Sequence, residues 1–359
     1  MEFFKNIRSL IFSKKISLLS KKNSIFLLLV LTLIIIISPS NFTLQWVGLS
    51  LAMFSTMTND SIQTLGTFLS SNSKEKWWKM WIYVGILFLI TILVGWFLYN
   101  HRLDFKRLYG IQYDPSANIM HFIAPILLII LTCNKIPVST TFLILSVFTT
   151  QDIMTFMLVK TILGYFIAFA FSFIIWYFLL KFFKKIFEDF SDSKIKKWRI
   201  FQWISTGMLW IIWLIQNTSN IVVYIPRRIN IYSLILIIML GIVMIGFTIY
   251  NKGGPIQEIV DEKTDMSNIH YTAMINFSFA IMIALMTCIG TIPIATTWMF
   301  IGILGGRELA IAKYETNQEL SLKDRYKIAE KKIFRDLVLA GLGIAISLSF
   351  YMINTTFDL

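Results

Sequence analysis

Long apolar segments are the feature of this chain that most limits its fold. Residues 24–38 read SIFLLLVLTLIIIIS and residues 81–99 read WIYVGILFLITILVGWFLY. A helix needs about 20 predominantly apolar residues to cross a bilayer. Of the 359 residues 56% are hydrophobic and 15% are charged, whereas soluble domains carry about 25% charged residues. The sequence therefore predicts an all-α polytopic membrane protein embedded in a lipid bilayer.

Several function classes are excluded at this point. The net charge is +13, but the basic residues lie in short segments between apolar runs, so we exclude nucleic-acid binding. Cys133 and Cys288 both lie in apolar runs and indicate neither a disulfide framework nor a thiolate metal site. The paired carboxylates or clustered histidines that a membrane-embedded enzyme would need near the surface are missing, so we predict no enzymatic activity.

Apolar blocks recur along the whole chain. Two short blocks, 137–150 and 292–305, begin at Ile-Pro pairs and cannot span a bilayer. They predict re-entrant hairpins, which are tolerated where protein or a water-filled cavity satisfies the backbone. The remaining blocks predict membrane helices at 24–39, 44–70, 80–99, 118–133, 154–180, 201–225, 231–250, 271–289 and 334–353.

An internal repeat organises these blocks. The segment TCNKIPVSTTF, which contains Pro137, resembles TCIGTIPIATTW, which contains Pro293, and the two prolines lie 156 positions apart. The pair Gln45-Trp46 recurs as Gln202-Trp203 at an offset of 157. Carried forward, this offset lays residues 59–63 on residues 216–220. Two matches at nearly one offset predict repeats at about 43–180 and 200–353.

The charges of the connecting segments predict that these repeats are inverted. Segment 251–269 is acidic whereas its repeat partner 100–117 is basic, which suits opposite sides of the membrane. One feature disagrees with the inverted topology. This topology is expected to place Lys74, Lys76 and Lys79 outside, whereas basic residues favour the cytoplasmic side. The predicted divisions are a cytoplasmic N-terminal segment 1–23, a first helix plus repeat 1 at 24–180, a basic cytoplasmic linker 181–199, repeat 2 at 200–353 with a charged insertion 306–333, and a tail 354–359.

Polar residues interrupt the block 44–70 and form the first candidate site. A carboxylate at a helix centre costs about 2.5–3.5 kcal/mol by insertion scales, so Asp60 is expected to face a cavity or an ion. Asn59 and Gln63 share a helical face beside it. Their oxygens suit a monovalent cation such as sodium on Asp60, and their amide N–H groups suit an oxyanion. Alternatively, Thr58 to Ser61 only end one half-helix and start another; both interpretations are compatible in inverted-repeat transporters.

Hydroxyl groups that follow the two prolines form the second candidate site. Ser139, Thr140 and Thr141 are mirrored by Thr296 and Thr297. At a half-helix start they would lie beside exposed backbone N–H groups, which suits phosphate-like anions. Packing and capping are the alternative role for such residues. Lys160 and Asp152, by contrast, are expected near a helix end, where their side chains snorkel to the interface.

These motifs resemble a known family. Residues 58–67, TNDSIQTLGT, resemble the GANDVANAFGT signature of the inorganic phosphate transporter (PiT) family. Residues 137–141, PVSTT, resemble its PVSTTH signature. Residues 293–297, PIATT, resemble the second copy, which continues through Gly302 and Gly306. In that family both signatures occur in each of two inverted halves.

The resemblance implies one shared site between the halves. One half would be lined by Asn59, Asp60, Gln63, Ser139, Thr140 and Thr141. The other half would be lined by Gln216, Asn217, Asn220, Thr296 and Thr297. The family takes up phosphate with sodium or protons, and some bacterial relatives carry sulfate.

The departures from the family pattern bear on function. Asn217 replaces the family's second acidic residue, and Phe142 and Trp298 replace its histidine. The loss of a carboxylate changes how many cations can be coupled. We expect a divergent member that takes up phosphate or a related oxyanion by sodium or proton symport, without a cofactor, in the plasma membrane with a cytoplasmic N-terminus. A sulfate permease, a non-transporting accessory or sensor protein, and a homodimer stay open.

Overall fold

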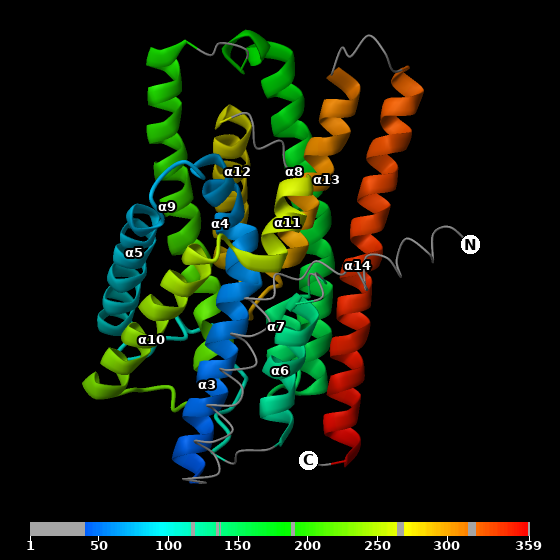
Figure 1. The fold of residues 1–359 in the computed structure, drawn as a ribbon. Helices are drawn as coiled ribbons and strands as arrows, with labels where there is room; N and C mark the ends of the chain where they lie inside the picture. Colours follow the sequence, from blue (N-terminus) through cyan, green and yellow to red (C-terminus); the bar gives the residue numbers. More distant parts are fainter. Residues whose placement is uncertain are drawn as a thin grey trace.

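The computed structural model describes residues 40–115, 119–133, 136, 138–187, 191–263, 269–314 and 321–357. The predicted segment 1–23 and first helix 24–39 lie outside the described residues. The remaining chain forms an elongated bundle of helices (Figure 1). The predicted all-α polytopic class is confirmed.

Five helices of the described chain are long and apolar enough to cross a membrane. Their outward faces carry bare apolar side chains, such as Phe97 at 79% exposure, which lipid would cover. These helices are α5 (Trp77–Leu98), α8 (Gln151–Phe187), α10 (Ile231–Tyr250), α12 (Ile269–Cys288) and α14 (Leu322–Phe357). A second set carries more polar residues and supplies most of the candidate site. This set is α3 (Asn41–Thr58), α4 (Asp60–Ser71), α9 (Asp192–Val222) and α13 (Thr296–Tyr314).

The apolar block 44–70 is broken at Asn59. Asn59 is both the C-cap of α3 and the N-cap of α4, and its backbone dihedral angles are φ −108° and ψ −78°. Just before the break, the hydroxyls of Thr56 and Thr58 donate to the carbonyls of Ala52 and Phe54, at 2.7 and 2.9 Å. Such bonds compete with the backbone ladder and bend helices. Thr218 makes the same kind of bond to the Leu214 carbonyl in the unbroken α9, so these bonds accompany the break and do not by themselves explain it.

Two hairpins enter the bundle from opposite ends. In Figure 1, α6 (Ile119–Cys133) and the short α7 (Thr140–Leu145) lie in the lower half, whereas α12 and α13 occupy the upper half. Helix α8 then rises to the upper end and α14 descends to the lower end. This is the inverted arrangement with a broken helix and re-entrant hairpins that the sequence predicts. The exact repeat boundaries remain predictions.

The charged segments are mostly helical where the structure describes them. Helix α8 runs on to Phe187 and α9 begins at Asp192, so most of the expected linker 181–199 is helix at the upper end of Figure 1. Within the insertion 306–333, α13 continues to Tyr314 and α14 begins at Leu322. Charged residues do not end these helices, because the helices extend beyond the apolar part of the bundle.

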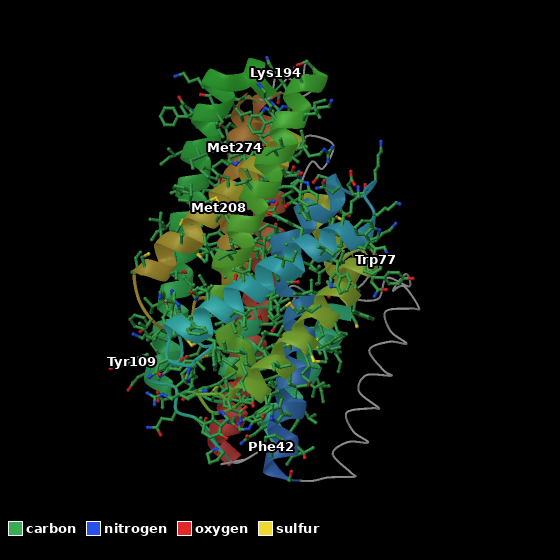
Figure 2. All side chains as sticks on the ribbon, turned by 90° about the vertical axis from the view of Figure 1, so that its left-hand side faces the viewer. Phe42, Trp77, Tyr109, Lys194, Met208 and Met274 are labelled. Carbon is green, nitrogen blue, oxygen red and sulfur yellow. The ribbon has the colours of Figure 1, made fainter. Side chains whose placement is uncertain are left out.

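The turn after α4, which carries Lys74 and Lys76, lies beside α9. The Asn72 carboxamide accepts a bond from Arg199 Nη1 at 2.9 Å, so the turn after α4 lies at the same end as the basic segment 181–199. Figure 2 shows Phe42, at the start of α3, at the opposite end from Lys194. Helices α3 and α4 together therefore run from the end of the bundle that holds Phe42 toward the basic segment. The membrane side of Lys74, Lys76 and Lys79 stays a prediction.

Helices α8 and α13 pack at backbone distance. A Cβ atom on Gly302 would lie 2.6 Å from the Tyr165 carbonyl oxygen, and one on Gly306 would clash with the Phe169 carbonyl oxygen. Small residues allow such close approach in membrane helices. The two glycines that continue the second signature thus hold the α12–α13 hairpin against α8.

We predict that Gly306→Ala destabilises the protein. The added methyl group meets backbone atoms, which cannot rotate away, and overpacking of this kind costs about 1–3 kcal/mol. Gly341→Ala in α14 is the matched control, because a Cβ atom there has nothing within 4 Å. Thermal unfolding of the purified protein should show a lower midpoint for Gly306→Ala alone. Equal midpoints for the two variants would contradict the close packing.

Candidate functional site

The Asp60 carboxylate is the centre of the site. It lies in the first turn of α4 and is 1% exposed, where the helix N-terminus favours negative charge. Thr140 Oγ1 donates to Oδ2, Asn59 Nδ2 donates to Oδ1 at 3.1 Å, and Thr297 Oγ1 donates to Oδ1 at 3.4 Å. Thr140 belongs to the first hairpin and Thr297 to the second. One buried carboxylate therefore joins the broken helix to both hairpins.

Asn217 occupies the corresponding place in the second repeat. Its Oδ1 accepts a bond from Thr296 Oγ1 at 3.5 Å, as Asp60 accepts one from Thr140. The offsets between these pairs are those found in the sequence repeat. Unlike α3 and α4, α9 is continuous here, and Asn217 Nδ2 donates to the Trp213 carbonyl of its own helix at 3.0 Å. The second half of the site is thus built on an unbroken helix and carries no charge.

Two carboxamides connect these groups to the first hairpin. Asn59 Nδ2 donates to the Val138 carbonyl at 2.6 Å, just before α7. Asn220 Nδ2 donates to Thr141 Oγ1 at 3.0 Å and to Asn217 Oδ1 at 3.3 Å. The first hairpin is therefore bound by one asparagine from each repeat.

Several buried amide atoms at the site have no hydrogen-bond partner among the described residues. Each belongs to a side chain that is at most 5% exposed. Leaving a buried polar group unpaired costs about 1–3 kcal/mol. Since the orientation of an amide is assigned rather than observed, these groups can offer either oxygens or N–H groups to a ligand. The atoms are Asn59 Oδ1, Gln63 Nε2, Gln216 Nε2 and Asn220 Oδ1.

The structure buries all the predicted site residues but does not give them one role. Ser139 caps α7, where its hydroxyl accepts a bond from the Phe142 N–H at 3.4 Å. Gln63 lies one turn beyond Asp60 in α4. Gln216 Oε1 accepts a bond from Thr287 Oγ1 at 3.3 Å. The others meet around two centres: Asn59, Asp60, Thr140 and Thr297 form the first, and Thr141, Asn217, Asn220 and Thr296 form the second.

The snorkelling expected of Lys160 is wrong. Its side chain is 8% exposed and Nζ donates to the Ile292 carbonyl at 2.9 Å. The turn between α12 and α13 leaves backbone carbonyls without helical partners, and a cation satisfies them. Thr287 is a further neighbour of the site that was not predicted, although its Thr-Cys pair recurs in both repeats.

The donor set around Asp60 fits a monovalent cation. No cluster of three or more His, Cys, Asp or Glu residues that could hold a metal occurs in the described ranges. Besides the carboxylate, the nearby oxygens are neutral: the hydroxyls of Thr140 and Thr297 and the Val138 carbonyl that binds Asn59. A single negative charge among neutral oxygens would hold sodium, which Asp60 was predicted to bind.

Comparison with known proteins identifies the fold. No protein-family model matches the sequence, and no curated protein matches it either. A solved structure titled "The sodium-dependent phosphate transporter" superposes on 88% of this chain and 99% of its own, with a TM-score of 0.54. The two chains share one fold. Their sequences are 14% identical, so the likeness concerns the fold, as the PiT resemblance implies.

We predict that Asn59→Ala destabilises the protein more than Asn251→Ala does. Asn59 joins α4 to the first hairpin, whereas Asn251, also a helix cap, donates only to the Phe247 carbonyl of its own helix. Removal of the buried amide leaves the Val138 carbonyl unpaired, at a cost of about 1–3 kcal/mol. Unfolding midpoints of the two purified variants test this. An equal loss would show that the Asn59–Val138 bond does not hold the hairpin.

Proposed function

We propose that this protein is a secondary active transporter that takes up inorganic phosphate, or a related oxyanion, together with a sodium ion or a proton. The observation that carries the proposal is that hydroxyls from two inverted hairpins bind one buried carboxylate, Asp60. Inverted repeats that meet at a polar midplane site are the architecture of such transporters. The shared fold with a protein titled as a sodium-dependent phosphate transporter supports the same function.

The coupling cation would bind at Asp60. A carboxylate at this depth is unstable without a partner, and the threonine hydroxyls supply only neutral dipoles. Sodium would gain oxygens from Asp60, Thr140 and Thr297, whereas a proton would neutralise the carboxylate directly. Either ion removes the charge that would otherwise repel an anion.

The oxyanion would bind next to this cation, between the two repeats. The amide groups of Gln63, Gln216 and Asn220 are buried and have unpaired atoms. The unpaired amide N–H groups of Gln63 and Gln216, together with the hydroxyls of Thr141 and Thr296, can donate to several phosphate oxygens at once. A site of neutral donors beside a bound cation suits a tetrahedral oxyanion and leaves phosphate and sulfate as candidates.

Transport would follow from movement of the hairpins against the rest of the bundle. Because α6–α7 and α12–α13 enter from opposite ends, displacement of either one opens the site toward one side only. Breaking the bonds of Thr140 or Thr297 to Asp60 is the local event in each movement. Moving one net positive charge inward releases about 2.3 kcal/mol per 100 mV of membrane potential. If the charge of the cations exceeds that of the anion, the membrane potential would therefore drive uptake.

A non-transporting accessory or sensor protein is the second candidate function. The observation that favours it is the neutral Asn217, which removes one charge from the site. It predicts that the protein binds the oxyanion but does not accumulate it. The plasma membrane location, the cytoplasmic N-terminus and a homodimer likewise remain predictions.

We predict that Asp60→Asn strongly lowers coupled uptake of labelled phosphate into proteoliposomes. The substitution keeps the size of the side chain and removes its charge. Hydrogen bonds to charged groups are worth about 1.5–3 kcal/mol, so uptake should fall about tenfold or more. Asp152→Asn is the matched control, because Asp152 is exposed at the start of α8. Unchanged gradient-driven uptake by Asp60→Asn would overturn the assignment of the cation site.

We predict that Asn217→Asp raises the number of cations moved with each oxyanion. The new carboxylate would lie beside Thr296 and Asn220 and would need a cation of its own before an anion could bind. Its uptake should depend more steeply on cation concentration than that of the unaltered protein. The measurement is the charge moved per phosphate in voltage-clamped proteoliposomes. If the charge moved per phosphate is unchanged, residue 217 does not set the number of coupled cations.

A further inference from the structure

Two buried cationic side chains lie beside one turn, residues 287–292, between α12 and α13. Arg107, in the segment between α5 and α6, is 5% exposed. Its Nη2 donates to the Thr287 carbonyl at 2.7 Å and its Nη1 donates to the Gly290 carbonyl. From the other side, Lys160 Nζ donates to the Ile292 carbonyl at 2.9 Å. Both cations therefore concentrate positive charge at the turn.

These charges are not neutralised within the described part of the chain. The ion pairs found there join other residues, such as Arg102 with Asp104 and Lys332 with Glu308. Carbonyl dipoles stabilise a cation but do not cancel its charge, and like charges in a buried site repel strongly. An ammonium has three N–H donors and a guanidinium has five, whereas Lys160 uses one and Arg107 uses two. Several charged donors are left for an anion.

The turn is connected to the central site. Thr287, whose carbonyl binds Arg107, donates from its hydroxyl to Gln216 Oε1 at 3.3 Å. Gln216 Nε2 has no partner, although the side chain is 1% exposed. On its other side the turn reaches the outer face of the helix bundle at Cys288, the last residue of α12. The turn thus lies between the surface and the amides of repeat 2.

We propose that Arg107 and Lys160 form a second binding site for a tetrahedral oxyanion, which captures the anion before it passes by Thr287 and Gln216 to the central site. The inference rests on the proposed function and adds the place where the substrate is first bound. A guanidinium offers paired N–H groups to two oxygens of phosphate or sulfate, and an ammonium adds a point charge. The alternative is that Arg107 and Lys160 only hold the α12–α13 hairpin in place. That role needs their hydrogen bonds to the carbonyls but no positive electrostatic potential at the turn.

Cys288 is a native probe of this potential. In a Cys133→Ala background, Cys288 is the remaining cysteine of the chain, and its labelling rate can be compared for an anionic and a cationic thiosulfonate reagent of similar size. A site that concentrates anions should label about tenfold faster with the anionic reagent. Inorganic phosphate should slow the labelling, and it should still do so when Asp60→Asn is added. Equal labelling rates of Cys288 with the two reagents, or labelling that phosphate does not slow, would overturn the proposal. This test leaves Arg107 and Lys160 unaltered.

Charge variants of Lys160 provide the second test. Lys160→Met should abolish the protection and raise the KM for phosphate uptake while the maximal rate is kept, whereas Lys160→Arg should retain the protection. Lys79→Met, at an exposed lysine paired with Glu75, is the control and should change neither. Protection that survives Lys160→Met would overturn the role of this residue. Protection of Cys288 without any uptake would instead refute the proposed function while the second site stands.

Discussion

The bond network around the Asp60 carboxylate is the interaction on which the rest of the structure depends. A buried carboxylate is stable only if donors surround it, and no single helix can supply enough of them. Here the donors come from the helix break at Asn59, from Thr140 in one hairpin and from Thr297 in the other. The break in α3–α4, the opposite entry of the hairpins and the close packing of α13 on α8 all serve to bring these groups to one point.

The two halves of the site are similar in position but unequal in charge. Thr140 with Asp60 and Thr296 with Asn217 are equivalent pairs, and only the first contains an ion. The second half is neutral and α9 is continuous there, and Asn217 donates to the Trp213 carbonyl of its own helix. The two halves therefore differ both in backbone structure and in charge.

Much of this architecture could be predicted from sequence, for physical reasons that are local. Hydropathy locates the spans, the recurrence of Pro and Thr-Thr in both halves identifies the hairpins, and the opposite charges of segments 100–117 and 251–269 indicate the inversion. The convergence of Asp60, Thr140 and Thr297 follows once the repeats are inverted. Solved-structure similarity at 14% identity supports the fold that these short motifs imply.

Other features depend on contacts between distant segments, which sequence patterns do not encode. Lys160 resembles a snorkelling residue because nothing nearby in the chain reveals the free Ile292 carbonyl that holds it. Arg107 reads as one charge in a basic loop, although it binds a turn some 180 residues later.

The measurement that tests the central claim most directly is the affinity of the purified protein for phosphate, by calorimetry, with and without sodium and at several pH values, with sulfate as competitor. If Asp60 couples a cation to the oxyanion, sodium or acid should tighten phosphate binding, and phosphate should tighten cation binding by the same factor. Phosphate binding of equal strength with and without either cation would contradict the account, as would the absence of phosphate and sulfate binding to folded protein.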